Sequence, residues 1–199
     1  MSKKESTFAN MVITLLVITI VAGLSLGFVN DLTIAPKAKA RLERKINALK
    51  QVLPAFDNNP VEEVKLIKVA SAKDSVEIYP AFCKGQNVGV AVTGSSEKGF
   101  SGLVKLMVSF KPDGNIQNIA VLEQKETPGL GTKMKDEKFL QQFLDKIPGT
   151  FNLKVKKDGG DVDALTGATI SSRAFSEAVQ MAYDVFKEQK ETLTKGKTQ

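Results

Sequence analysis

Asp163-Ala-Leu-Thr-Gly-Ala-Thr-Ile-Ser-Ser172 is the stretch around which this chain of 199 residues is organised. It follows a loop that contains Gly159-Gly160 and precedes a helical pattern that starts near Ser172. The first backbone N–H groups of a helix lack intrahelical partners and carry the positive end of the helix dipole, so an anion binds there readily. Gly167 and Ala168 would leave the backbone open to a phosphate group. The alternative is a helix cap, in which a Thr or Ser hydroxyl satisfies the same N–H groups without a ligand.

The composition excludes several kinds of site. The chain has one cysteine, Cys83, and no histidine, so it has no intrachain disulfide, no cysteine cluster for a metal and no histidine general base. The basic residues behind the net charge of +6 are spread along the chain, without the interleaved aromatic residues typical of nucleic-acid binding. We therefore predict no catalytic residue, no metal site and no nucleic-acid partner, and we expect any chemistry to belong to a bound cofactor.

The N-terminal segment is apolar over the length of a membrane span. Residues 11–29 read MVITLLVITIVAGLSLGFV, and no charged residue occurs between Glu5 and Asp31. A helix needs about 20 apolar residues to cross a bilayer, whereas the apolar core of a cleaved signal peptide has about 7–15. The length favours a retained single-pass transmembrane helix at 11–30, after a short N-terminus at 1–10.

Residues 31–54 predict an amphipathic connecting helix. After Pro36, apolar residues recur at spacings of three and four, and Pro54 closes the pattern; they are Leu42, Ile46, Leu49 and Leu53. We expect this face to pack on the core of the following domain. The opposite face is basic, so attachment to a membrane surface is the alternative.

Residues 55–190 predict one α+β domain in which helices pack on an antiparallel sheet. Lys111-Pro-Asp-Gly114 is a turn signal that joins two strand patterns into a hairpin. Strand patterns occur at 61–69, 75–82, 88–92, 103–110, 116–122 and 151–155, and helical patterns at 135–147 and from about 172 to 186. Residues 191–199 are expected to form a flexible tail.

Three motifs give the domain a family resemblance. Asp163-x-x-Thr166-Gly167-Ala168-Thr169 resembles the flavinylation motif of the FMN-binding domain family. This family includes the G subunit of the Rnf ion-pumping electron transport complex and the C subunit of the sodium-translocating NADH:quinone reductase. Gly99-Phe-Ser-Gly102 and Glu126-Thr-Pro-Gly-Leu-Gly131 resemble two further motifs, and all three occur in family order. With the N-terminal helix, the resemblance covers nearly the whole chain.

The resemblance implies that Thr169 carries FMN through a phosphoester bond, which a separate flavin transferase forms with FAD as donor. The residues that provide the recognition context would be Asp163, Leu165, Thr166, Gly167 and Ala168. The residues that would lie beside the flavin ring are Glu126, Thr127, Leu130 and Gly131. Many Rnf-type members have a histidine two residues before the glutamate, where this chain has Gln124.

The resemblance further implies an electron-transfer subunit of a membrane-bound, ion-translocating ferredoxin:NAD⁺ oxidoreductase, not catalytic alone, with other Rnf subunits as partners. It places the protein in the bacterial inner membrane, with a cytoplasmic N-terminus and a periplasmic FMN domain. The basic residues after the span outnumber those before it and favour the reverse orientation, but long domains translocate largely regardless of charge. Two alternatives stay open: a free-standing membrane-tethered flavoprotein, and a structural or interaction subunit in which Thr169 is only a helix cap.

Overall fold

The computed structural model describes residues 7–69 and 75–194. The chain divides into two compact units, Met1–Arg44 and Lys45–Gln199. Within the first unit lies most of helix α1 (Phe8–Val52), whose most apolar window has a mean hydropathy of 2.6 and is fully exposed. By length and composition this helix can cross a membrane, as the sequence predicts for residues 11–30. The sequence predicts a flexible tail at 191–199, but helix α3 (Thr169–Thr194) continues to Thr194. Residues 195–199 lie outside the described part of the chain.

Pro36 does not separate two helices. The sequence predicts a break there, between a transmembrane helix and a connecting helix, but α1 runs through Pro36 without ending. A proline inside a helix removes one backbone hydrogen bond and favours a local distortion, which a long helix tolerates.

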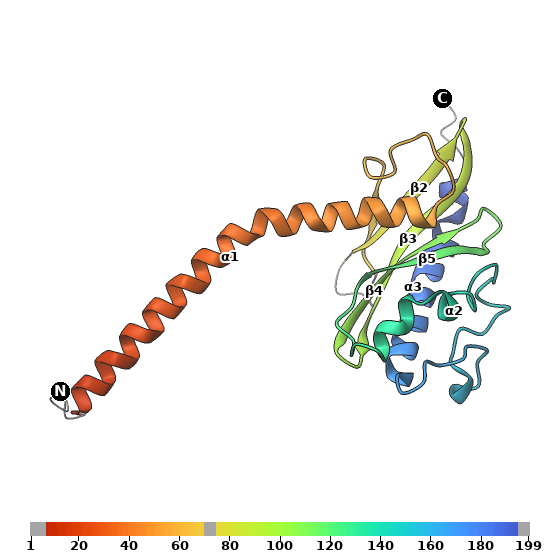
Figure 1. Ribbon diagram of the computed structural model, residues 1–199. Coiled ribbons are helices and arrows are strands. Elements are labelled where there is room, and N and C mark those ends of the chain that lie inside the picture. Colours follow the sequence, from red (N-terminus) through yellow and green to blue (C-terminus); the bar gives the residue numbers. More distant parts are fainter. Residues whose placement is uncertain (1–6, 70–74, 195–199) are drawn as a thin grey trace. The chain divides into compact units, whose positions relative to one another are not determined.

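The second unit is built on a five-stranded antiparallel sheet with the order β1-β2-β3-β4-β5 (Figure 1). Its strands are β1 (Lys65–Ile67), β2 (Val76–Cys83), β3 (Gln86–Gly99), β4 (Gly102–Phe110) and β5 (Ile116–Glu123). Each strand pairs with the next along the chain, so the predicted antiparallel sheet is confirmed. The predicted hairpin also forms: the Gly114 N–H donates to the Lys111 carbonyl at 2.9 Å, and Gly114 has φ 103°.

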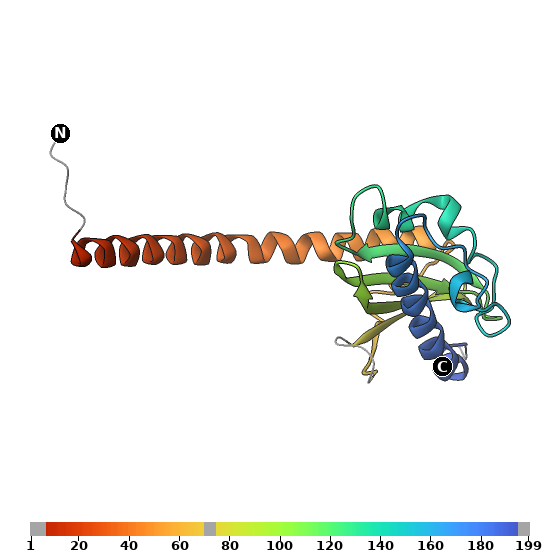
Figure 2. The same cartoon turned by 90° about the horizontal axis from the view of Figure 1, so that it is seen from below.

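Helix α3 covers one face of the sheet, and the two views in Figures 1 and 2 show it lying along the strands. Gly94 of β3 permits this contact, because a Cβ at Gly94 would collide with the Ala178 carbonyl of α3. The core between them contains fully buried phenylalanines: Phe110, Phe143, Phe175 and Phe186. On the other face pack Leu49, at the end of α1, and Leu53, directly after it. This contact is the one that the sequence predicts for the amphipathic segment.

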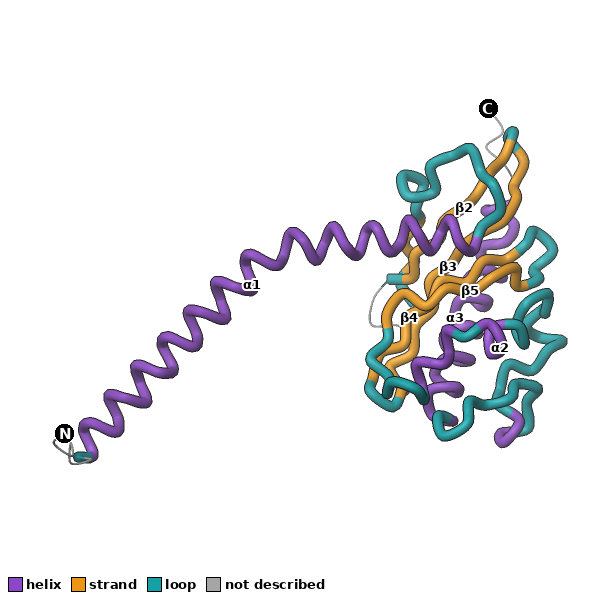
Figure 3. The backbone as a smooth tube through the Cα atoms, viewed as in Figure 1, coloured by secondary structure: helices purple, strands orange, loops and turns teal. Residues whose placement is uncertain are grey.

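The region between β5 and α3 is less regular than the sequence predicts, as Figure 3 shows by its long loops. The expected helix at 135–147 is replaced by the short helices η1 (Gly131–Lys135) and α2 (Glu137–Leu140). Asp145 has φ 56°, which a continuing helix does not allow. In place of the expected strand at 151–155 there are two isolated parallel bridges: Pro148 to Phe151, and Val155 to Val162, which encloses η2 (Lys156–Asp158). The region between β5 and α3 therefore consists mainly of loops.

Candidate functional site

The three sequence motifs meet at Glu126. Its carboxylate is buried, and Oε1 accepts a hydrogen bond from the Ser101 N–H at 3.1 Å. Its Oε2 accepts a hydrogen bond of 2.6 Å from the Ser171 hydroxyl, in the first turn of α3. One side chain thus joins the turn between β3 and β4, the loop after β5 and the start of α3. Glu126 and Ser171 are 45 positions apart in the sequence.

Two glycines make room for this carboxylate. A Cβ at Gly99 would lie 2.5 Å from Glu126 Oε1, and a Cβ at Gly131 would lie 2.6 Å from Ser171 Oγ. Both distances are too short for any side chain, so the two positions require glycine for reasons of space. The conformation of the loop is also fixed from its beginning, because Gln124 Oε1 accepts the Glu126 N–H at 2.5 Å. Gln124, where family members often carry histidine, therefore braces the backbone here.

The Thr166–Thr169 turn is held from the inside by Ser172. The Ser172 hydroxyl accepts the Leu165 N–H at 2.9 Å and donates to the Ala168 carbonyl at 2.9 Å. Gly167 supplies the left-handed backbone of the turn, with φ 74°. The sequence predicts the start of the helix near Ser172, but α3 begins three residues earlier, at Thr169. Ser172 is thus a buried brace, a role that its sequence position alone does not indicate.

Asp163 is held in a different way from the rest of its motif. Its carboxylate pairs with Lys156 at 2.8 Å on the surface. Its backbone is clamped by the Gln142 side chain, whose Oε1 accepts the Asp163 N–H at 2.7 Å and whose Nε2 donates to the Asp163 carbonyl at 3.3 Å. Gln142 follows α2, and sequence reasoning missed it because the contact joins two loops that are distant in the chain.

Thr169 is the first residue of α3 and is partly exposed. In the part of the chain that the structure describes, no hydrogen bond joins its hydroxyl to another protein group, so the hydroxyl does not cap the helix. The backbone N–H groups of residues 169–171 likewise find no acceptor among the described residues. Free N–H groups at the positive end of a helix suit a phosphate, so this position fits a phosphate ester on Thr169.

The predicted site residues divide into a buried frame and an exposed surface. The frame consists of Glu126, Gly131 and Ala168, which are buried, together with Leu165, which is partly buried. The exposed members are Thr127, Leu130, Asp163, Thr166 and Gly167. The Leu130 side chain lies over the turn, with Cδ2 only 3.3 Å from the place of a Cβ on Gly167. The buried set fixes the geometry, and the exposed set is available to a ligand or a partner.

Three exposed apolar side chains also lie in the motifs. Phe100 is 67% exposed, Leu130 42% and Ile170 46%, which is unusual for residues of this size in a folded domain. Phe100 and Leu130 each belong to one of the motifs, and Ile170 directly follows Thr169. Of these three, the Leu130 side chain lies next to the Gly167 turn.

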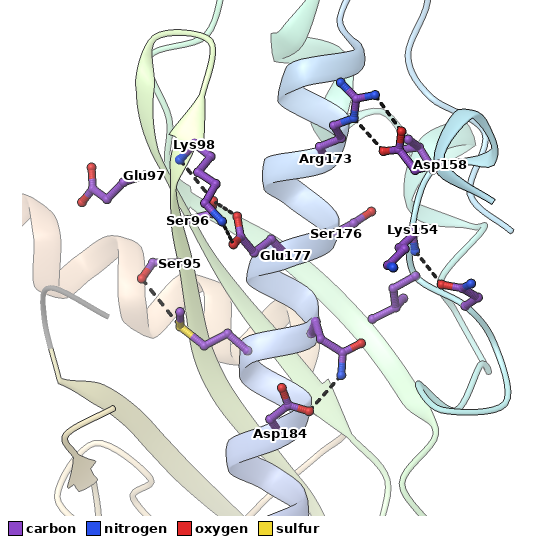
Figure 4. Close-up of a pocket in the computed structure, with 15 residues that line it drawn as sticks. Ser95, Ser96, Glu97, Lys98, Lys154, Asp158, Arg173, Ser176, Glu177 and Asp184 are labelled. Atoms are coloured by element: carbon purple, nitrogen blue, oxygen red, sulfur yellow. Dashed lines mark hydrogen bonds and ion pairs between the residues drawn. The ribbon is translucent and has the colours of Figure 1, made fainter. Parts of the chain in front are cut away.

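A groove of about 920 Å³ runs along the outer face of α3 (Figure 4). Arg173 and Asp158 form a bidentate pair across it, with both nitrogen–oxygen distances at 2.7 Å. On the β3 side, Glu177 pairs with Lys98 at 2.5 Å and accepts a hydrogen bond from Ser96 at 2.6 Å. Partial burial raises the pKa of Glu177, but these two hydrogen bonds and the Lys98 charge outweigh it and hold that pKa below its ordinary value.

Comparison with known proteins places this site in a family. The FMN-binding domain family matches residues 99–184, which contain all three motifs. The G subunit of the ion-translocating oxidoreductase complex of Shewanella baltica is 34% identical over 164 residues, which cover 77% of each chain. The corresponding protein of Aliivibrio fischeri is 34% identical over 161 residues, covering 76% of this chain and 77% of that one.

The fold is also similar to a solved structure. The crystal structure of Shewanella oneidensis NqrC superposes with a TM-score of 0.50 and 21% identity, over 71% of this chain and 69% of that one. At this identity the likeness shows the fold alone. The family match, the two relatives and the three motifs lead to one assignment. The chain belongs to the FMN-binding domain family and, within it, to the G subunits of ion-translocating oxidoreductase complexes.

Proposed function

We propose that this protein is an electron-transfer subunit that carries FMN on Thr169 through a phosphoester bond. The observation that carries the proposal is the Thr169 hydroxyl, which has no hydrogen-bond partner among the described residues and lies at a helix start with free N–H groups. When bound, FMN supplies the redox chemistry, and the protein supplies attachment, orientation and electrostatics. The relatives, which are G subunits of ion-translocating oxidoreductase complexes, support this role.

The motif residues have three roles at this site: they bind the phosphate, support the turn and contact the flavin. The N–H groups of residues 169–171 lie at the positive end of α3 and together stabilise the charge that remains on the phosphate, by about 0.3–1 kcal/mol at an exposed site. Ser172 and Glu126 hold the turn and the first turn of α3, so that the Thr169 hydroxyl stays in a fixed place. Thr127 and Leu130 offer exposed surface beside the turn for contact with the flavin.

The complex around this subunit follows from the same proposal. The protein works with other membrane and peripheral subunits, and a flavin transferase attaches its FMN. Helix α1 anchors it in the bacterial inner membrane, and the FMN domain faces the periplasm. A covalent bond prevents loss of the flavin to a compartment from which it is not recovered. The redox activity belongs to the assembled ferredoxin:NAD⁺ oxidoreductase, which couples it to ion movement.

The test is whether flavin stays on the denatured chain. The full chain is produced with a flavin transferase, and its band is viewed under ultraviolet light after denaturing electrophoresis, with mass mapping of peptide 163–173. We expect fluorescence and an FMN adduct on Thr169, complete loss in Thr169→Ala, and a smaller loss in Thr166→Ala, which changes the recognition context but keeps the attachment hydroxyl. A dark band, or a fluorescent Thr169→Ala band, would overturn the proposal.

A further inference from the structure

The guanidinium group of Arg173 has one nitrogen that the protein does not use. Its Nε and Nη2 each donate a hydrogen bond to the Asp158 carboxylate at 2.7 Å. Within residues 7–69 and 75–194, no hydrogen bond joins the remaining nitrogen, Nη1, to another protein group. The Arg173 side chain is 49% exposed, so a ligand can approach it from solvent. A guanidinium group suits phosphate oxygens because its N–H donors are fixed in one plane.

Helix geometry brings this nitrogen toward Thr169. The two residues are four positions apart in α3, so they share one face with about 5–6 Å between their Cβ atoms. Side chains in a helix lean toward its N-terminus and cover the preceding turn, which for Arg173 contains Thr169. Figure 4 shows Arg173 extending away from Asp184, toward the N-terminal end of α3, with its third nitrogen directed away from Asp158. A group bonded to the Thr169 hydroxyl oxygen therefore lies within reach of Nη1.

Asp158 and the loop that carries it hold the guanidinium in place. Asp158 lies in η2, and the loop is folded on itself by Asn152. The Asn152 N–H donates to the Asp161 carboxylate at 2.8 Å, and Asn152 Nδ2 donates to the Gly159 carbonyl at 3.2 Å. A bidentate pair fixes the plane of a guanidinium, so the direction of Nη1 is set before any ligand binds. Because both carboxylate oxygens face Nε and Nη2, the side of the guanidinium that carries Nη1 presents only donors.

The start of α3 supplies the other donors of an anion site. The N–H groups of residues 169–171 have no acceptor in the described part of the chain. A phosphodiester between Thr169 and FMN has two ester bonds and one ionised oxygen, and therefore a single negative charge. The positive end of one helix and one guanidinium are together suited to such a monoanion.

We propose that Arg173 binds the phosphate of the FMN that is attached to Thr169, with Nη1 donating to the ionised oxygen while Asp158 holds the guanidinium. The proposal rests on the attachment of FMN at Thr169. Neither Arg173 nor Asp158 belongs to the three motifs, so this contact is independent of them. The contact fixes the phosphate, which leaves only the ribityl chain and the ring of the flavin free to move.

The experiment measures how strongly Mn²⁺ broadens the ³¹P resonance of the phosphodiester, because a cation beside the phosphate repels a second cation. Full chains flavinylated by the transferase are compared in a phosphate-free detergent, after mass mapping has confirmed FMN on Thr169. Asp158→Asn is the common background, so that a carboxylate released by the loss of Arg173 does not itself bind Mn²⁺. In this background Arg173→Gln removes the guanidinium. Lys187→Gln, the matched control, removes an equal charge from an exposed position roughly 27 Å further along α3 at about 1.5 Å per residue.

We expect Arg173→Gln to increase the broadening about threefold at physiological ionic strength, for a charge about 6 Å from the bound Mn²⁺, and to shift the ³¹P resonance. The Lys187→Gln chain should keep the values of the background, because its distance from the phosphate exceeds the screening length of about 8 Å. FMN on Thr169 with the broadening and the ³¹P position unchanged in Arg173→Gln would overturn this proposal and leave the attachment standing. Absence of FMN from Thr169 in the unsubstituted chain would overturn both. An equal increase in Lys187→Gln would contradict the contact, since it would show an effect of net charge alone.

A chain with Arg173→Gln that takes up no FMN is decided by Arg173→Lys, which keeps the charge and loses the planar donors. Attachment of FMN to Arg173→Lys, with broadening close to that of the background, supports the contact. Failure of both variants to take up FMN would mean that the side chain serves the transferase before the phosphate arrives, and the proposed contact would be wrong.

Discussion

The carboxylate of Glu126 and the hydroxyl of Ser171 are 2.6 Å apart and join the loop after β5 to the first turn of α3. Ser171 lies two residues after Thr169, so this bond fixes the place where α3 begins relative to the sheet. The other carboxylate oxygen reaches the Ser101 N–H, which ties the same point to the turn between β3 and β4. The glutamate of the loop motif is thus a structural brace, and the exposed surface of that loop belongs to its neighbours.

Removal of the Glu126 charge should weaken this junction. A hydrogen bond to a charged group contributes about 1.5–3 kcal/mol, so we expect Glu126→Gln to lower the free energy of unfolding by about 1–3 kcal/mol. The flavin content of the purified chain should fall as well, because the start of α3 loses its support. Urea unfolding of the detergent-solubilised chain measures the first effect, and flavin absorbance per protein measures the second. Glu123→Gln is the control, because the side chain at the end of β5 makes no such junction, and equal effects in both variants would contradict the prediction.

Two buried serines in the same helix should differ sharply when truncated. Ser172→Ala leaves the buried turn without its brace and the Leu165 N–H without an acceptor, at a cost of about 1–3 kcal/mol. Ser176→Ala removes a buried hydroxyl that has no partner in the described protein, so we expect the flavin-free chain to lose no stability. Thermal unfolding of the two flavin-free variants provides the comparison. A larger loss for Ser176→Ala than for Ser172→Ala would show that the brace is misassigned.

Local patterns predicted the regular part of this fold. The turn at Lys111–Gly114 carries its own chemistry, Pro at the second position and Gly at the fourth, so the hairpin follows from adjacent residues. The apolar stripe of α3 and the packing of Leu49 and Leu53 also follow from spacing alone. By contrast, the short turns at 141–147 interrupt a good helical pattern, because tertiary contacts and the left-handed Asp145 decide the backbone there.

The site was predictable as a set of motifs, but not as a geometry. Thr169 and its context remain predictions from short sequence stretches, whereas the contacts that hold these stretches in place join residues far apart in the chain. Glu126 with Ser171 and Gln142 with Asp163 are examples, and no periodicity indicates such pairs. The unpartnered Ser176 hydroxyl could not be found from the sequence, because its burial depends on the loop at 152–158 folding against α3.

The pH dependence of stability should report the partly buried carboxyl of Glu77 on β2. Burial raises the pKa of Glu77, but hydrogen bonds from Lys45 and Tyr79, together with the Lys45 charge, hold that pKa below its ordinary value of 4.5. Because the folded pKa is the lower one, the stabilisation is present above about pH 4.5 and is lost as the pH falls through the folded pKa. Unfolding measured from pH 7 to pH 3 should therefore show a decline in this window that is shallower in Glu77→Gln. An unchanged slope in the variant would mean that other carboxyl groups cause the decline.

The orientation of the protein can be tested because the chain has a single cysteine. In a Cys83→Ser background, a cysteine is introduced as Lys157→Cys, at an exposed residue of η2, or as Ser2→Cys, at the N-terminus. If the FMN domain faces the periplasm, a membrane-impermeant maleimide added to intact spheroplasts labels Lys157→Cys, and Ser2→Cys reacts only after lysis. The basic residues that follow the apolar span favour the opposite result by the positive-inside rule. Labelling of Ser2→Cys in intact spheroplasts, with Lys157→Cys protected, would show that these charges decide the topology and would place the flavin on the cytoplasmic side.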